Sequence, residues 1–196
     1  MFPSILILLS LITFHAIAYN PFFSDSEKVS PEKWKKAYWT CILNYCTTNI
    51  IGYYFYIPTT ERFYMSDLLY FIPHIIISDS VFYWTHRLFH TKLLYPLHKQ
   101  HHEWHQPVSV SFLDSHPLEH LLVNVPTVIT PLIIFPVSDF QQALWIISAT
   151  INSVTGHMYS LDSKQPHVLH HKYFKYNYGA GGCHLMDRIM GTYKTD

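Results

Sequence analysis

Three short stretches decide the fold of this chain: His86-Arg-Leu-Phe-His90, His98-Lys-Gln-His101-His102 and His167-Val-Leu-His170-His171. The first has the spacing HxxxH, and the other two share the spacing HxxHH. Side chains three and four positions apart lie on one face of a helix, so each stretch can direct two or three imidazoles at one point. Random placement of the 15 histidines in 196 residues would give about 0.1 HxxHH matches, so the pattern is specific.

These three histidine boxes predict a metal centre, because histidine is the commonest metal ligand among side chains. Their eight imidazoles exceed the three or four ligands that one zinc takes, and therefore suit two metals. Imidazole binds iron, copper, zinc and nickel, so the ligand type leaves the metal open. Soluble di-iron bundles use Glu-x-x-His pairs, and this sequence has no ExxH. Neutral imidazoles also suit a site next to lipid, since they bring no negative charge that must lose its water.

The composition around the boxes is that of a membrane protein. Apolar residues make up 49% of the chain and charged residues only 13%, whereas soluble domains carry about 25% charged residues. The length suits a single domain. A formal net charge of zero argues against nucleic acid as a partner. Cys41, Cys46 and Cys183 form no CxxC, which predicts neither a disulfide framework nor a zinc ribbon.

Five apolar stretches are candidates for membrane helices: 3–19, 37–58, 66–85, 118–136 and 140–156. Crossing a bilayer takes about 20 mostly apolar residues, which 37–58 and 66–85 reach and the others approach. The last two are separated only by Pro136–Asp139, which indicates a hairpin. Prolines 126 and 131 interrupt its first arm, a feature that membrane helices tolerate. We therefore expect an all-α integral membrane protein with four to five membrane helices.

Charge placement predicts the orientation. If all five stretches cross, residues 20–36, 86–117 and 157–196 share one side, and they hold twelve of the thirteen Lys and Arg residues. The positive-inside rule assigns that side to the cytosol. The three boxes lie on the same side, which predicts a cytosolic, histidine-rich helical cap.

The first apolar stretch has two interpretations. Ala16-Ile17-Ala18 resembles a signal-peptidase site after an apolar run. The start of the chain has no basic residue, however, and cleavage would place the Lys28–Lys36 cluster in the lumen. We favour a retained segment, which could cross the bilayer or only dip into it.

The order and spacing of the boxes resemble those of the fatty acid hydroxylase/sterol desaturase superfamily. The matching features are HRLFH, HKQHH and HVLHH, with an apolar hairpin before the last box. Further matches are His116-Pro-Leu-Glu119, Asn177-Tyr-Gly179, Asp187-Arg188 and Gly191-Thr192. The resemblance covers about residues 66–196, which predicts N-terminal membrane segments in 1–65 and a catalytic domain in 66–196.

The resemblance implies a membrane-bound, O2-dependent lipid hydroxylase or desaturase of the endoplasmic reticulum. It implies two histidine-ligated irons, a sterol or fatty-acyl substrate, and electrons from NAD(P)H through cytochrome b5 or an equivalent donor. His157, just after the hairpin, resembles an additional family histidine. The implied ligands are His86, His90, His98, His101, His102, His157, His167, His170 and His171. Residues that could support them are His116, Glu119, His184, Asp187 and Arg188.

Some features depart from the family or leave choices open. Met186 stands where the family usually has Trp, and the segment 179–184 is rich in glycine. The ligands do not distinguish hydroxylation from desaturation. A hydrolytic or non-catalytic membrane protein that binds zinc with the same boxes is the alternative. We expect His15 and His74, which lie in apolar stretches away from the boxes, to be structural.

Overall fold

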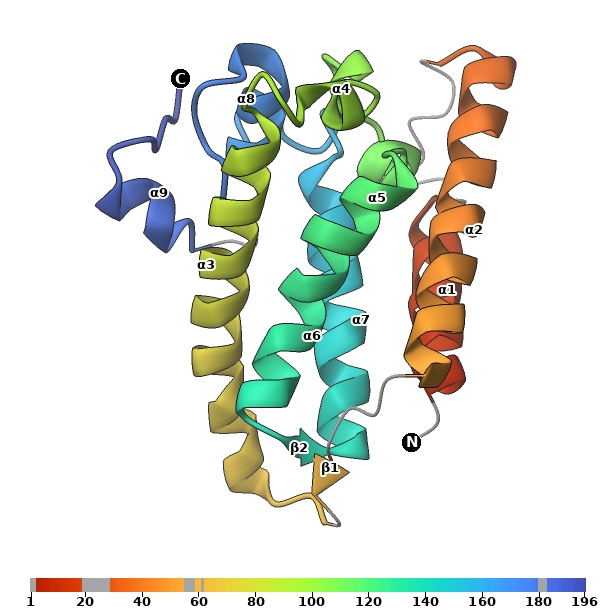
Figure 1. Ribbon diagram of the computed structural model, residues 1–196, viewed down its shortest axis with the longest axis vertical. Coiled ribbons are helices and arrows are strands. Elements are labelled where there is room, and N and C mark those ends of the chain that lie inside the picture. The colour runs from red at the N-terminus through yellow and green to blue at the C-terminus, as the bar shows by residue number, and fades with distance from the viewer. Residues whose placement is uncertain (1–2, 19–28, 55–58, 61, 180–182) are drawn as a thin grey trace.

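The computed structural model describes residues 3–18, 29–54, 59–60, 62–179 and 183–196. Every predicted apolar stretch contains a helix (Figure 1). The long helical elements are α1 (Pro3–Ala18), α2 (Pro31–Tyr54), η2 (Met65–Tyr70) with α3 (Phe71–Phe89), α5 (Pro117–Glu119) with η5 (His120–Asn124) and α6 (Val125–Ile134), and α7 (Asp139–Gly156). Within the described residues, strands are limited to β1 (Thr59–Thr60) and β2 (Val137–Ser138). The prediction of a helical fold is confirmed.

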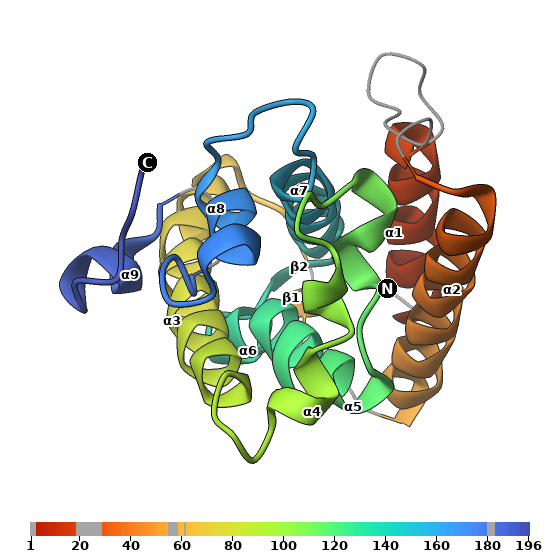
Figure 2. The same cartoon turned by 90° about the horizontal axis from the view of Figure 1, so that it is seen from above.

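The long helices alternate in direction, so the histidine boxes gather at one end of the molecule (Figure 1). The short elements at that end are α4 (Tyr95–His98), η3 (His101–Glu103), η4 (Ser109–Leu113) and α8 (Pro166–Tyr173). At the opposite end, β1 pairs in parallel with β2, which ties the segment before α3 to the turn between α6 and α7. Seen from above, α8 lies across the top of the bundle, between α3 and α7 (Figure 2).

Two helical stretches in the described chain, Met65–Phe89 and Pro117–Ile134, are long and apolar enough to cross a membrane. Only 11% of the apolar window in the first stretch is buried inside the protein. Ile72, Ile76 and Trp84 expose 62%, 42% and 51% of their surfaces, which is an apolar outer face suited to lipid. The fold is thus consistent with a helical membrane protein, while a total of four to five spans stays a prediction.

A core of aromatic and polar contacts joins α1, α2 and η4. The Phe14 ring lies 5.1 Å from the Phe112 ring, and both are buried. Asn44 Nδ2 on α2 donates to Leu113 O at 2.9 Å and to Ser115 O at 3.1 Å. These bonds hold the segment that leads from the second histidine box into α5.

The hairpin of α6 and α7 is tied by Trp145 Nε1, which donates to Val128 O at 2.9 Å. His74 packs against the same tryptophan and pairs with Phe135 O at 3.0 Å. His15 Nε2 lies 2.7 Å from Tyr38 Oη. Both histidines therefore hold helices together, away from the boxes.

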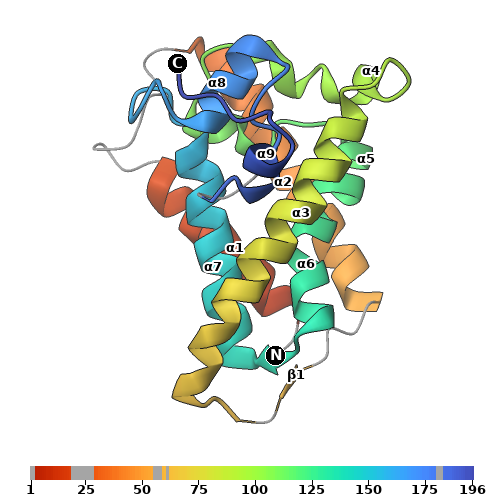
Figure 3. The same ribbon diagram turned by 90° about the vertical axis from the view of Figure 1, so that its left-hand side faces the viewer.

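The side chains of Glu119 and His120, where α5 meets the π-helical segment η5, point in different directions. Glu119 faces the second histidine box, whereas His120 Nε2 lies 2.6 Å from Thr48 Oγ1 on α2. Such an insertion of one residue into a helical turn is common at functional sites. The last helix, α9 (Leu185–Ile189), packs on the outer side of α3 (Figure 3).

Candidate metal centre

Five helical elements deliver the nine predicted ligands. His86 lies in the last turn of α3, and His90 is its C-cap residue. The third box lies on α8, whose first helical residue is Pro166, a position that proline favours. His157 is the C-cap residue of α7. The second box is not one continuous helix, because α4 ends at His98 and His101 begins the 3₁₀ turn η3.

The nine side chains form two groups, each with its ligand nitrogens within 4.8 Å of one another. The five-histidine group contains His86, His90, His98, His102 and His170. The four-histidine group contains His101, His157, His167 and His171. All nine residues that the sequence singled out are thus brought together.

Each box directs two imidazoles at one point, as expected, and in both HxxHH boxes the third histidine joins the other group. His98 and His102 join the five-histidine group, and His101 joins the other. His167 and His171 join the four-histidine group, and His170 joins the other. On a helix, positions i+3 and i+4 lie about 100° apart around the axis, so adjacent histidines diverge. This divergence lets one box serve two sites.

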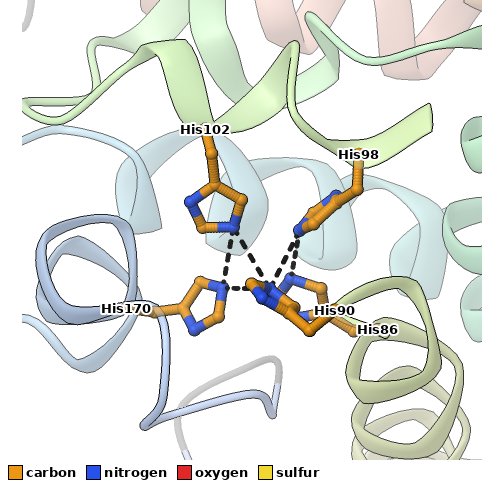
Figure 4. Close-up of side chains that lie close together, drawn as sticks. All are labelled: His86, His90, His98, His102 and His170. Atoms are coloured by element: carbon orange, nitrogen blue, oxygen red, sulfur yellow. Dashed lines mark hydrogen bonds between the residues drawn. The ribbon is translucent and has the colours of Figure 1, made fainter. Parts of the chain in front are cut away.

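In the five-histidine group the Nε2 atoms point at one another (Figure 4). His90 Nε2 lies 3.0 Å from His170 Nε2, 3.1 Å from His98 Nε2 and 3.2 Å from His102 Nε2. His86 Nε2 lies 3.1 Å from His98 Nε2. The rings come from α3, α4, η3 and α8, so the centre fixes four elements relative to one another.

The partners of the opposite ring nitrogens indicate which of these Nε2 atoms carry lone pairs. His86 Nδ1 lies 2.9 Å from Tyr178 O, His98 Nδ1 lies 2.8 Å from Glu119 Oε1, and His170 Nδ1 lies 2.7 Å from Tyr176 O. The two carbonyl oxygens can only accept, and Glu119 accepts in its carboxylate form, so Nδ1 then holds the proton and a neutral ring has a bare Nε2. Bare nitrogens that face each other repel unless a cation lies between them. The geometry therefore fits a metal ion bound by Nε2 atoms.

Imidazole nitrogens also face one another in the four-histidine group. His157 Nδ1 lies 2.7 Å from Ser153 O, and its Nε2 lies 3.2 Å from His101 Nε2 and 3.0 Å from His167 Nε2. His171 is fully buried, and neither of its ring nitrogens has a hydrogen-bond partner among the described residues. Buried polar atoms are almost always paired. An unpaired imidazole beside three others fits a metal ligand.

The two groups adjoin each other. The rings of His102 and His171, one from each group, have centroids 4.9 Å apart. The rings of His101 and His102 lie 6.0 Å apart. The arrangement can therefore hold two metals next to each other.

Burial keeps the imidazoles neutral. It lowers the pKa of His157 to about 4 and those of His98, His101, His167, His170 and His171 well below the usual value, and the charges of neighbouring imidazoles lower most of these further. Metal ligation needs the neutral form. The ligands are thus ready to bind at neutral pH without losing protons.

Glu119 is the direct carboxylate partner of the centre. It is buried, and its Oε1 accepts the Nδ1 proton of His98 at 2.8 Å. Its Oε2 has no hydrogen-bond partner among the described residues. A carboxylate behind a ligating imidazole fixes the ring and makes it a stronger donor.

Asp187 organises the C-terminal segment beside the five-histidine group. Its carboxylate accepts from Tyr178 N at 2.8 Å, Gly179 N at 2.7 Å and Thr192 Oγ1 at 2.7 Å. Burial would raise the pKa of this carboxyl, but hydrogen bonds from His184, Thr192 and two backbone amides outweigh it, and the pKa is lowered. His184 contacts Asp187 at 3.3 Å and no member of the histidine groups by hydrogen bond.

Two of the predicted supporting residues lie away from the groups. His116 is the N-cap of α5, where its Nδ1 accepts from Leu118 N at 3.2 Å. Arg188 is exposed, lies over the Tyr193 ring and donates to Cys183 O. It forms no salt bridge with Asp187 in the described chain.

Several atoms that position the ligands were missed by the sequence analysis. The carbonyl oxygens of Ser153, Tyr176 and Tyr178 have no sequence signal, since every residue has one. Asp79 does have a signal, because an acid within an apolar stretch is a functional candidate. It is buried on α3, and its Oδ2 accepts from Met186 N at 2.8 Å, which fastens α9 to that helix.

Two neighbouring all-histidine groups at one end of an apolar helical bundle fit the class of membrane proteins that bind metals through histidine boxes. The family model for fatty acid hydroxylase matches residues 71–192. The chain belongs to the fatty acid hydroxylase family, as the histidine boxes predicted.

Curated relatives agree with this assignment. Fatty acid hydroxylase domain-containing protein 2 of Homo sapiens is 30% identical over 185 residues, which cover 85% of this chain and 54% of that protein. The Delta(7)-sterol 5(6)-desaturase of Leptosphaeria maculans is 32% identical, with 73% of this chain and 42% of the relative covered. Human lathosterol oxidase is 33% identical, with 63% of this chain and 44% of that protein covered. The chain therefore spans about half the length of the curated relatives it matches. No solved structure matches it.

Proposed function

We propose that this protein is a membrane-bound oxidase that hydroxylates or desaturates a lipid with O2 at two histidine-ligated irons. The observation that carries the proposal is the convergence of imidazole nitrogens in two adjoining groups of five and four histidines. The sterol desaturase and lathosterol oxidase among the relatives support lipid oxidation. Zinc would fit the nitrogens equally well, so the choice of iron rests on the family.

Hydroxylation and desaturation consume the same reactants. Hydroxylation converts C–H and O2, with two electrons and two protons, into C–OH and one water. Desaturation removes two hydrogens from neighbouring carbons and releases two waters from the same inputs. When bound, iron supplies the activation of O2 that both reactions require. The protein holds the metals through its imidazoles and buries the site, which excludes water.

The substrate is a lipid that reaches the site from the bilayer. The apolar outer faces of α3 and α6 include Ile72, Ile76 and Ile133, which are 62%, 42% and 55% exposed. Because the boxes lie at the ends of these helices, a lipid moving along them meets the centre near the membrane surface. Sterol and fatty-acyl chains both satisfy this requirement.

Electrons come from NAD(P)H through cytochrome b5 or an equivalent donor. Five exposed lysines surround the histidine end: Lys92, Lys99, Lys164, Lys172 and Lys175. A positive surface favours docking of an acidic donor protein. Location in the endoplasmic reticulum with the histidine end in the cytosol is part of this proposal, and the basic residues at that end support it.

Lipid profiling with matched metal analysis tests the proposal. Cells that express the wild type should contain a new hydroxylated or desaturated lipid, and His170→Ala combined with His171→Ala should remove it, because the pair disables both groups. His105→Ala, which changes an exposed histidine outside the groups, should keep the product. Identical new lipids in the wild type and the double variant would contradict the metal assignment. Zinc alone, with no O2 consumption after reconstitution with iron, would favour the hydrolytic or non-catalytic alternative.

A further inference from the structure

One peptide group connects Asp187 to a predicted metal ligand. The amide that joins Tyr178 to Gly179 donates its N–H to Asp187 Oδ2 at 2.7 Å. Its carbonyl, Tyr178 O, lies 2.9 Å from His86 Nδ1. The described chain has no cis peptide bond, so this N–H and C=O point in opposite directions, toward the carboxylate on one side and the imidazole on the other.

We propose that Asp187 is a positioning residue that acts through the Tyr178–Gly179 peptide to orient His86 and to strengthen it as a metal ligand. This inference rests on the proposed metal centre. A carboxylate that accepts the amide N–H polarises the amide, and the carbonyl then becomes a better acceptor. His86 Nδ1–H donates to that carbonyl, which leaves more electron density on Nε2. A carboxylate directly behind a ligating histidine has the same effect.

The surroundings hold this peptide bridge rigidly. The second oxygen of Asp187, Oδ1, accepts from Tyr178 N and from Thr192 Oγ1. A side chain at position 179 would place its Cβ 2.8 Å from Asp187 Oδ2 and 2.7 Å from Asp79 Oδ1. Only glycine fits there without displacing the carboxylates, so Gly179 permits their close approach to the peptide.

The bridge distinguishes the two histidine groups. In the five-histidine group, His98 Nδ1 is hydrogen-bonded to the carboxyl group of Glu119. His86 is connected to the carboxylate of Asp187 through the Tyr178–Gly179 peptide. Within the described chain, no carboxylate is hydrogen-bonded to the four-histidine group, where His157 Nδ1 pairs with the helix carbonyl of Ser153. Negative charge stabilises the higher oxidation state of a metal. The metal in the five-histidine group should therefore have the lower reduction potential.

A metal titration tests the bridge without reference to lipid oxidation. Metal-free full-length protein in detergent is titrated with Co(II) against a chromophoric competitor, with Asp187→Asn as the variant. The wild type should bind two Co(II). Asp187→Asn should bind one of them about 10- to 100-fold more weakly, the usual effect of losing such a partner, and the other unchanged. Asp162→Asn, a change at an exposed aspartate at the same end of the molecule, should match the wild type.

The reduction potential supplies a readout that a purely structural role would not move. In iron-loaded Asp187→Asn, one of the two midpoint potentials should shift to a more positive value. If Asp187→Asn does not fold, Thr192→Val provides the test, because it removes a hydrogen bond to Asp187 and not the carboxylate. It should weaken one Co(II) in the same direction by a smaller factor, and Thr192→Ser should restore the wild-type affinity.

The outcomes separate this inference from the proposed function. Two Co(II) bound by the wild type, with affinities and potentials unchanged in folded Asp187→Asn or in Thr192→Val, would overturn the inference alone. Equal weakening of both metals would also overturn it, since that result indicates general loosening. A wild type that binds no Co(II) would overturn the proposed metal centre and the bridge with it.

Discussion

His86 Nε2 and His98 Nε2 lie 3.1 Å apart, although the Nδ1 atoms of both rings already face acceptor oxygens. With Glu119 as a carboxylate, both rings hold their protons at Nδ1, and no proton remains for a hydrogen bond between the two Nε2 atoms. Two lone pairs at this distance need a positive charge between them. The need for a cation between such nitrogens explains why so many histidines lie together at one end of the fold.

Each of the adjacent histidines on α8 should control a different metal. His170→Ala removes a member of the five-histidine group, and His171→Ala removes a member of the four-histidine group. Metal per chain, measured by mass spectrometry on purified protein, should fall from about two to about one in each single variant and toward zero in the double variant. Each single variant should also lose the lipid product. If either single variant removed both metals, the two groups would not bind independently.

Glu119→Gln should weaken metal binding while leaving the protein folded. The amide oxygen can still accept the His98 proton, but the negative charge behind the imidazole is lost. We expect affinity for one metal to fall about 10- to 100-fold, measured by competition with a chelator. Glu103→Gln, a change at an exposed glutamate near the second box, is the matched control. Equal affinities in Glu119→Gln and the wild type would show that the carboxylate does not act on the metal.

His116→Ala should cost stability and spare the metals. His116 accepts a backbone N–H at the start of α5, and loss of an N-cap costs about 0.5–2 kcal/mol. Thermal unfolding should therefore shift to lower temperature, with about two metals still bound. His116→Asn, which restores a good cap, should recover the stability. Loss of a metal in His116→Ala would instead make this histidine part of the centre.

Removal of the metals should destabilise the histidine end of the molecule. Binding to the folded state alone stabilises it by about 2.7 kcal/mol when the free metal exceeds its dissociation constant 100-fold. Chelator-treated protein should unfold at a lower temperature and exchange amide hydrogens faster in α4 and α8 than in α2. Unchanged exchange in α4 and α8 would argue against a metal that joins these elements.

A glycosylation tag tests the orientation. A tag inserted into residues 59–65, at the end opposite the histidine boxes, should be modified in the lumen. A tag at the C-terminus, which lies at the histidine end (Figure 1), should stay unmodified. The reverse pattern would overturn the cytosolic placement of the centre, and modification at both positions would require a different number of spans.

The sequence by itself determined the helical class, the five apolar helices, the family and all nine histidines that converge. It could do so because the length of an apolar run and the spacing of histidines are local patterns, which can be recognised without knowing how the helices pack. His157 lies outside the boxes and was expected only from the family resemblance, yet it joins the four-histidine group.

Only the tertiary structure decided how the histidines divide into two groups and which residues form hydrogen bonds to their imidazoles. Spacing along one box cannot reveal that His101 separates from His98 and His102, because the division depends on where the other helices place their imidazoles. It likewise cannot reveal that Arg188 faces outward while Asp187 faces inward, or that the carbonyl of Tyr178 meets His86. Those contacts join residues up to 92 positions apart, and they exist only because α3, α8 and the C-terminal segment are packed together.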